Sequence, residues 1–118
     1  MGRRKSLSLE VESVAGGVVV RLAGSAGMND AEALQARLCE LVTSQTGPVV
    51  LDLEELDFIS SQGLGALIAV QVDHRRHRGP LRLVNPQPAI RDILNVTRLT
   101  QIFPLYDSAT DALEELPG

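Results

Sequence analysis

The apolar run from Val49 to Leu53 constrains the fold of this chain more than any other segment. Four of its five residues are aliphatic, and the preceding 46–48 segment, Thr-Gly-Pro, is expected to end the helix before it. A strand with this composition has both of its faces covered, as the central strands of parallel sheets do. Covering both faces requires helices on the two sides of the sheet. The run therefore predicts an α/β domain.

The segment before this run predicts an antiparallel hairpin. Apolar and polar residues alternate over residues 7–12, which is the period of a half-buried strand, and the alternation resumes over 18–22. The Ala15-Gly16-Gly17 stretch between them supplies the turn. We expect the second strand to end at Gly24, where a Ser-Ala-Gly-Met-Asn-Asp loop begins.

Helices and strands alternate after the hairpin. Asn29 or Asp30 can cap a helix over 31–44, and residues 54–59 are expected to form a short acidic loop after the central strand. The elements predicted beyond it are a largely apolar helix that starts near Ser60, a strand over 81–84, a helix that starts at Asn85-Pro86, a strand over 102–105 and a helix opened by Ser108. This order implies parallel pairing through right-handed crossovers. We therefore predict a mixed, mostly parallel sheet of about five strands with about four helices.

The chain is expected to be one domain over residues 1–118, with residues 1–5 as a disordered, solvated tail. The net charge of −4 and the aromatic content of 3% disfavour a direct nucleic-acid partner. No apolar run is long enough to cross a bilayer, so membrane insertion is not expected. The lone Cys39 excludes an internal disulfide, and a cytoplasmic location is expected. No cofactor and no metal site are predicted.

An enzyme is not expected, and no catalytic residue is assigned. The two histidines, His74 and His77, lie at a basic helix end with no nucleophile in a triad-like position. The acidic residues of the 52–57 segment suggest a phospho-aspartate site like that of a response-regulator receiver domain, which is one alternative function. That function also needs an acidic pair after the first strand, where this chain has a tight glycine turn instead.

The Ser60-Ser61-Gln62-Gly63-Leu64-Gly65 turn carries the most functional information. It follows the central strand, and ligands of open α/β sheets bind outside the carboxyl ends of the strands. Either Ser60 or Ser61 can cap the next helix. Gly63 and Gly65 allow another backbone to approach closely. A phosphate at Ser61 would be tolerated at a helix start and would add about two negative charges to an uncharged surface.

The stretch VVLDLEELDFISSQGLGAL, residues 49–67, resembles the central motif of the STAS domain. This is the domain of bacterial anti-sigma factor antagonists, and it also occurs at the end of sulfate transporters. The loop after Gly24, the strand near 81–84, the helix near Ile90 and the segment 99–103 follow in family order, so the resemblance covers nearly the whole chain and implies the STAS fold.

The resemblance also implies residue roles. Aligned on Gly63-Leu64-Gly65, the phosphorylated serine of the family corresponds to Ser61, with Ser60 as the alternative acceptor. The family aspartate before the acceptor corresponds to Ser60, and a second family aspartate corresponds to Gly27, so two acidic positions are neutral here. Asp30 can replace the second in part. The partner-binding residues implied are Ser60, Ser61, Gln62, Gly63, Leu64, Gly65, Asn29 and Asp30.

The function implied is that of an anti-sigma factor antagonist that acts by partner switching. It would bind an anti-sigma factor, a serine kinase resembling histidine kinases, and thereby release a sigma factor. The other STAS role, an interaction module of a transporter or a lipid-trafficking complex, is a further alternative. Nothing in the sequence decides whether the chain is a monomer or a weak dimer.

Overall fold

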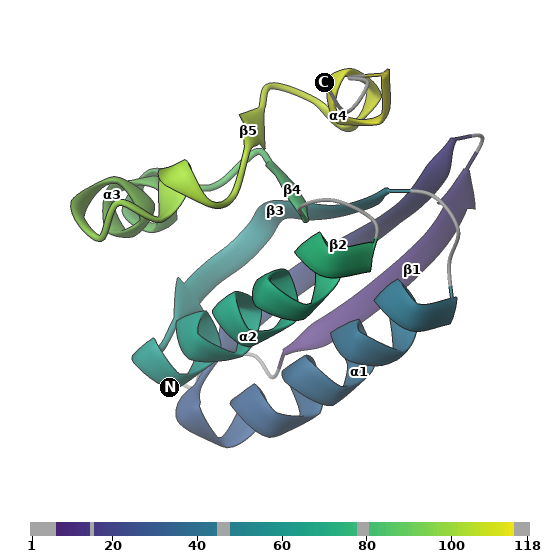
Figure 1. Cartoon of the computed structure of the whole chain (residues 1–118). Coiled ribbons are helices and arrows are strands. Elements are labelled where there is room, and N and C mark those ends of the chain that lie inside the picture. Colours follow the sequence, from purple (N-terminus) through teal and green to yellow (C-terminus); the bar gives the residue numbers. More distant parts are fainter. Residues whose placement is uncertain (1–6, 15, 45–47, 78–80, 115–118) are drawn as a thin grey trace.

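The computed structural model describes residues 7–14, 16–44, 48–77 and 81–114 of the chain. Within them a five-stranded sheet has the order β1-β2-β3-β4-β5 (Figure 1). The strands are β1 (Ser8–Val14), β2 (Gly17–Ala26), β3 (Val49–Ile59), β4 (Arg82–Val84) and β5 (Leu105–Tyr106). The β1–β2 pair is antiparallel and the other neighbours are parallel, which confirms the predicted mixed sheet that begins with a hairpin.

Four α-helices accompany the sheet among the described residues, as predicted. They are α1 (Ala31–Ser44), α2 (Ser61–His77), α3 (Pro88–Val96) and α4 (Ala109–Glu114). Two short 3₁₀ helices, η1 (Met28–Asp30) and η2 (Leu99–Gln101), are also present. Helices α1 and α2 lie side by side across one face of the sheet (Figure 1). Helix α4 packs against β3, β4 and β5.

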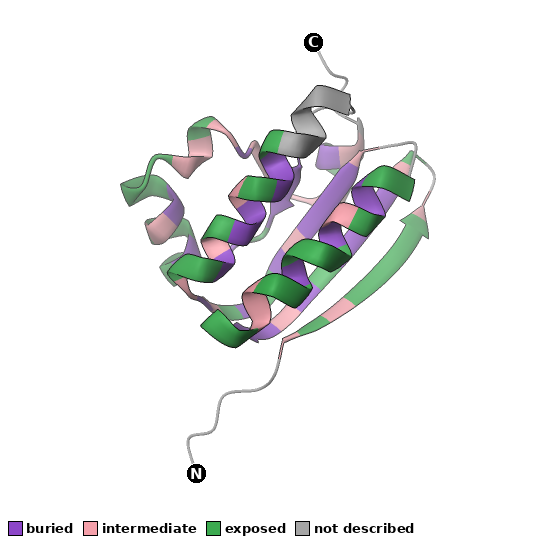
Figure 2. Ribbon diagram, turned by 60° about the horizontal axis from the view of Figure 1, so that its bottom comes forward, coloured by how far each residue is buried: buried purple, intermediate pink, exposed green. Residues whose placement is uncertain are grey.

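The core has two parts, one on each side of the sheet. The larger part lies under α1 and α2, whose inward sides are buried (Figure 2). The smaller part joins Val19, Val50 and Val84 to Ala112 of α4. Along β3, Val49 and Leu51 belong to the larger part and Val50 to the smaller. The central strand is therefore buried on both faces, as its composition predicts.

Two buried polar side chains connect helices α2 and α4 to the sheet and to the segments next to it. Gln71 of α2 is fully buried; its Oε1 accepts the Leu81 backbone N–H at 2.6 Å, and its Nε2 donates to the Ile102 carbonyl. Arg82 is 6% exposed and donates to the Ala112 carbonyl of α4. A buried polar group without such partners is costly, so these contacts hold α2 and α4 against the sheet.

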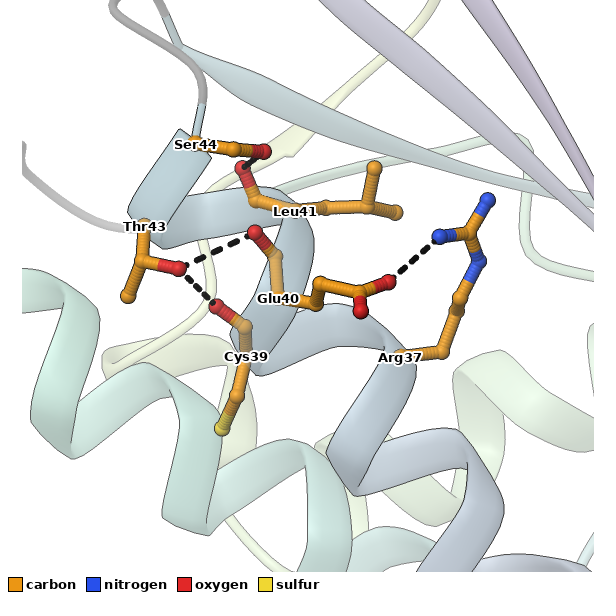
Figure 3. A network of polar contacts seen from close by, with 6 residues as sticks. All are labelled: Arg37, Cys39, Glu40, Leu41, Thr43 and Ser44. Carbon is orange, nitrogen blue, oxygen red and sulfur yellow. Dashed lines mark hydrogen bonds and ion pairs between the residues drawn. The ribbon is translucent and has the colours of Figure 1, made fainter.

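Polar contacts stabilise the second half of α1, which spans the predicted residues (Figure 3). The Thr43 hydroxyl lies 3.0 Å from the carbonyls of both Cys39 and Glu40, and Ser44 donates to a carbonyl three residues earlier. Arg37 and Glu40 form an ion pair at 2.7 Å. The hydroxyl bonds tie Thr43 and Ser44 to carbonyls three or four residues earlier in the same helix. Cys39 itself is half-buried and packs against the core.

The strands β2 and β3 are longer than the sequence predicts. β2 continues past Gly24 to Ala26, and β3 continues to Ile59, so the loop expected over 54–59 is wrong. The pairing of the two strands shifts twice: Arg21 pairs with Asp52 but Ala23 with Glu55, and Gly24 pairs with Leu56 but Ser25 with Phe58. Each shift adds one residue to β3. Such bulges disturb the alternation by which strands are recognised in a sequence.

Two predicted boundaries after β4 are also wrong. Helix α3 begins at Pro88 with Gln87 as its N-cap residue, because Asn85 has a left-handed φ of 57° and cannot open a helix. The last strand is Leu105–Tyr106 rather than residues 102–105. The 3₁₀ helix η2 ends at Gln101, shortly before β5. β5 lies at an edge of the sheet, as the nearby proline indicates.

Some predictions concern residues outside the described part of the chain. These are the tail over 1–5 and the Thr46-Gly47 helix stop, and the side chains of the basic 74–78 segment are likewise not described. The receiver-domain alternative, in contrast, is tested by the topology. A doubly wound sheet of that kind has the order 2-1-3-4-5. This sheet has a sequential order and an antiparallel first pair, so that alternative is wrong.

Candidate functional site

The predicted turn lies where β3 ends and α2 begins, beside the end of β2. The Ser60 backbone N–H donates to the Ala26 carbonyl at 2.8 Å. This bond continues the pairing of Ala26 with Ile59 by one residue. The turn and the loop after β2 therefore form one surface at the carboxyl ends of two neighbouring parallel strands, which is where the sequence places the site.

Ser60 is the residue that caps α2. Its Oγ accepts the Gly63 backbone N–H at 3.0 Å, and its carbonyl accepts the Leu64 N–H at 2.9 Å. A serine at this position satisfies an N–H group that the first turn of a helix leaves without a partner. Of the two serines that the sequence offers as caps, the structure selects Ser60.

Gly63 is required by close packing. A Cβ on this residue would lie 2.8 Å from Ile59 Cγ1 and 3.3 Å from the Ala26 carbonyl oxygen. The first turn of α2 therefore rests directly on the ends of β2 and β3, with no room for a side chain. Gly65 differs, because nothing lies within 4 Å of the corresponding position and the residue is exposed.

The outward side of the turn is polar and uncharged. Ser61 and Gln62 are exposed, and Leu64 is half-buried against the core. Ser61 is the first residue of α2 and makes no side-chain hydrogen bond within the described residues. Its hydroxyl is thus an accessible group beside the positive end of a 17-residue helix.

The loop after β2 folds into η1, which contacts α2. The Asp30 carboxylate accepts the Gly27 backbone N–H at 2.9 Å, and the Asp30 N–H donates to the Gly27 carbonyl. Asp30 therefore closes the η1 turn, whereas the sequence predicts Asn29 or Asp30 as the cap of α1. Asn29 is exposed beside Met28, which is 63% exposed. The structure thus brings both predicted segments, 29–30 and 60–65, to one surface.

A hydrogen-bonded pair of side chains joins β2 to β3 shortly before the turn. Ser25, which is 5% exposed, donates its hydroxyl to the Asp57 carboxylate at 2.7 Å. Asp57 is the additional residue of the second β3 bulge. Bulges often re-aim a side chain next to a functional site. The sequence carries no sign of this pair, because the two residues are far apart in the chain and meet only through the register shift.

The pair changes the expected charge of the site. Sequence comparison leaves the positions of the two family aspartates neutral, at Ser60 and Gly27. The structure instead holds two other carboxylates by hydrogen bonds, Asp57 near the end of β3 and Asp30 in η1. Asp57 accepts a hydrogen bond from Ser25 near the end of β2, and Asp30 accepts one from Gly27 in the loop that follows. Negative charge therefore lies near the end of β3 and in η1, whereas residues 60–65 carry none.

Other kinds of site find little support in the described residues. No group of three or more histidine, cysteine or acidic side chains there is placed to hold a metal ion. None of the described helices is long and apolar enough to cross a membrane. The surface built by the two loops presents hydroxyl, amide and carboxylate groups together with Met28, which suits recognition of another protein.

Comparisons with known proteins identify the family. The model of the STAS domain matches residues 8–112, and the chain belongs to this family. The anti-sigma F factor antagonist of Paenibacillus polymyxa is 28% identical over 112 residues, which cover 94% of this chain and 96% of the relative. The crystal structure of an anti-sigma factor antagonist from Mycobacterium paratuberculosis is 32% identical, covers 92% of each chain and superposes with a TM-score of 0.79.

The phosphorylated form of SpoIIAA, a Bacillus cell fate determinant, shares the fold. Its TM-score is 0.67 at 21% identity, over 91% of this chain and 97% of that one. At this identity the likeness is one of fold alone. It agrees with the STAS fold that the sequence predicts.

Proposed function

We propose that this chain is an anti-sigma factor antagonist that works by partner switching. In the unmodified state it binds an anti-sigma factor through the Ser60–Gly65 turn and the η1 loop, and so releases a sigma factor. The proposal is supported by the family and by relatives that carry this name across nearly the full chain. The role of the protein is binding, with no reaction of its own.

The observation that carries the proposal is that the two serines of the turn have different structural roles. Ser60 holds the helix start through its hydroxyl, whereas the Ser61 hydroxyl is exposed at the first position of α2. A phosphate on Ser61 would be stabilised by the helix dipole and would leave the cap intact. Ser60, in contrast, is half-buried and its Oγ already accepts the Gly63 N–H, so its hydroxyl is less accessible to a kinase. We therefore assign phosphorylation to Ser61 rather than Ser60.

Phosphorylation would switch binding off by charge. About two negative charges would be added to a turn, residues 60–65, that otherwise carries none. The unmodified surface suits a partner that offers hydrogen bonds to Ser61 and Gln62 and an apolar group to Met28. After modification, binding the same partner would remove water from the phosphate dianion without supplying a compensating charge, which is unfavourable.

The test is to incubate the protein with its cognate anti-sigma factor and ATP and to locate the phosphate by mass spectrometry. We expect one phosphate on Ser61, none in Ser61→Ala, and continued modification of Ser61 in Ser60→Ala. Binding is measured in parallel, with Ser61→Ala as the uncharged control for Ser61→Asp. We expect Ser61→Asp to bind at least about tenfold more weakly than Ser61→Ala. An unmodified wild type, together with unimpaired binding by Ser61→Asp, would remove Ser61 as the switch.

A further inference from the structure

The first strand of the sheet has a long free edge. β1 is the terminal strand, and all seven of its residues, Ser8–Val14, pair with β2 in an unbroken register. The opposite edge strand, β5, has two residues and follows Pro104. No described strand pairs with the outer side of β1. A straight edge of this length presents a row of backbone N–H and C=O groups that can pair with an added strand.

The side chains of β1 differ between its two faces. Leu9 and Val11 pair with core residues of β2, and Val11 is still 37% exposed. Glu10 and Glu12 lie on the other face. Arg21 is 3.1 Å from Glu12 and 3.7 Å from Asp52, so within the described residues Glu10 has no ion-pair partner. An added strand would therefore meet apolar groups on one face and carboxylates on the other.

This pattern opposes pairing with a second copy of the same strand. Consider two copies of β1 paired antiparallel so that their apolar side chains share a face. If at least five residues pair, the residue at the centre of the pairing is Glu10, Val11 or Glu12. Centring on either glutamate places it opposite itself, and centring on Val11 places Glu10 opposite Glu12 twice. Like charges directly opposite each other destabilise a strand pair.

We propose that the β1 edge binds an extended segment of a partner protein in which basic and apolar side chains alternate. Such a segment would complete the backbone pairing, place its apolar side chains beside Leu9 and Val11, and place its cations beside Glu10 and Glu12. A hollow of about 420 Å³, lined in part by Glu12, Val14, Arg21 and Leu113 of α4, adjoins the acidic face. It gives long side chains on that face room to extend. This surface is independent of the Ser60–Gly65 turn and of the function proposed for it.

The test uses the full chain and a capped peptide of about nine residues in which lysine and valine alternate. Binding is followed by the NMR shifts of backbone amides, with an alternating glutamate–valine peptide as the probe of opposite charge. We expect saturable shifts concentrated in Ser8–Val14 with the lysine peptide alone. Shifts that do not saturate, or that centre on another element, would overturn the proposal.

Charge reversal provides the matched control. Glu10→Lys is expected to weaken the lysine peptide about tenfold and to make the glutamate peptide bind. Asp92→Lys makes the same change in net charge at an exposed position of helix α3, outside β1. It should leave the affinities for both peptides unchanged. If Asp92→Lys weakens the lysine peptide equally, the attraction is a property of net charge, and the assignment to β1 fails.

Sedimentation separates a foreign strand from a second copy. The wild type should not associate through β1, whereas Glu10→Lys should, because in the register centred on Val11 it sets an ammonium group opposite Glu12 of the second copy twice. A wild-type dimer that Val11→Lys disrupts would show that the occupant is a second copy and would overturn the proposal.

Discussion

The two halves of β3 differ although they are one strand. In the first half, Val49–Leu53, four side chains are at most 1% exposed, and the pairing with β2 and β4 is regular as far as Asp52. The second half contains two bulges, carries exposed carboxylates and ends at the Ser60–Gly65 turn. The first half secures the fold, and the second positions a surface. A strand that had to remain regular to its end would not direct Asp57 toward Ser25.

Shortening a buried side chain in the first half of β3 should have the largest effect on stability. Leu51 is fully buried in the larger core, so Leu51→Ala is expected to lower the free energy of unfolding by about 3 kcal/mol. Glu55→Ala, at an exposed position of the second half, should stay within about 0.5 kcal/mol of the wild type. Urea denaturation measures both. Equal losses would show that the two halves do not differ as described.

The two glycines of the turn should respond differently to the same methyl group. Gly63→Ala places a Cβ 2.8 Å from Ile59 Cγ1 and should cost about 1–3 kcal/mol of unfolding free energy. Gly65→Ala has free space and a better helix propensity, so it should be neutral or stabilising by up to about 1 kcal/mol. Thermal melts compare the two. A stable Gly63→Ala variant would mean that the first turn of α2 does not rest on the strand ends.

Alanine substitution of the two serines should have different effects, with Ser60→Ala lowering stability and Ser61→Ala leaving it nearly unchanged. Ser60→Ala removes the N-cap and should cost about 1 kcal/mol. Ser61→Ala, which removes an exposed hydroxyl, should change the free energy of unfolding by less than about 0.5 kcal/mol. Denaturation of the variants, alongside the phosphorylation assay, provides the measurement. The reverse order of stabilities would assign the cap to Ser61 and remove the reason for choosing it as the acceptor.

The smallest effect is expected at the bulge. Ser25→Ala removes the hydroxyl that orients Asp57, but water can solvate the exposed carboxylate, so the expected loss is about 0.5–1 kcal/mol. Ser13→Ala, at an exposed position of β1, is the matched control and should have no measurable effect. If the Asp57 carboxylate contributes to binding, Ser25→Ala also lowers affinity for the anti-sigma factor. Unchanged affinity would limit Ser25 to a structural role.

Much of the architecture follows from sequence pattern alone. The apolar composition of Val49–Leu53 requires cover on both faces, and alternation over residues 7–12 and 18–22 predicts the hairpin; both are confirmed. The helix over 31–44 has the predicted bounds. These predictions succeed because burial of a repeating pattern is a local property of the chain. The start of α3 is missed because the left-handed φ of Asn85 depends on its surroundings.

The turn over residues 60–65 could be found from its serine and glycine residues, but the role of each residue could not. Ser60 and Ser61 are chemically identical, and only the direction of the chain leaving β3 decides which hydroxyl meets the Gly63 N–H. Likewise, Gly63 and Gly65 differ only in what packs against them. The carboxylate of Asp57 joins the site through a register shift between two strands distant in sequence. The sequence by itself determined the fold class and the position of the serine–glycine turn after the central strand, because both depend on local pattern. The tertiary structure decided which residues hold the site and which face outward, because that depends on contacts between separate segments.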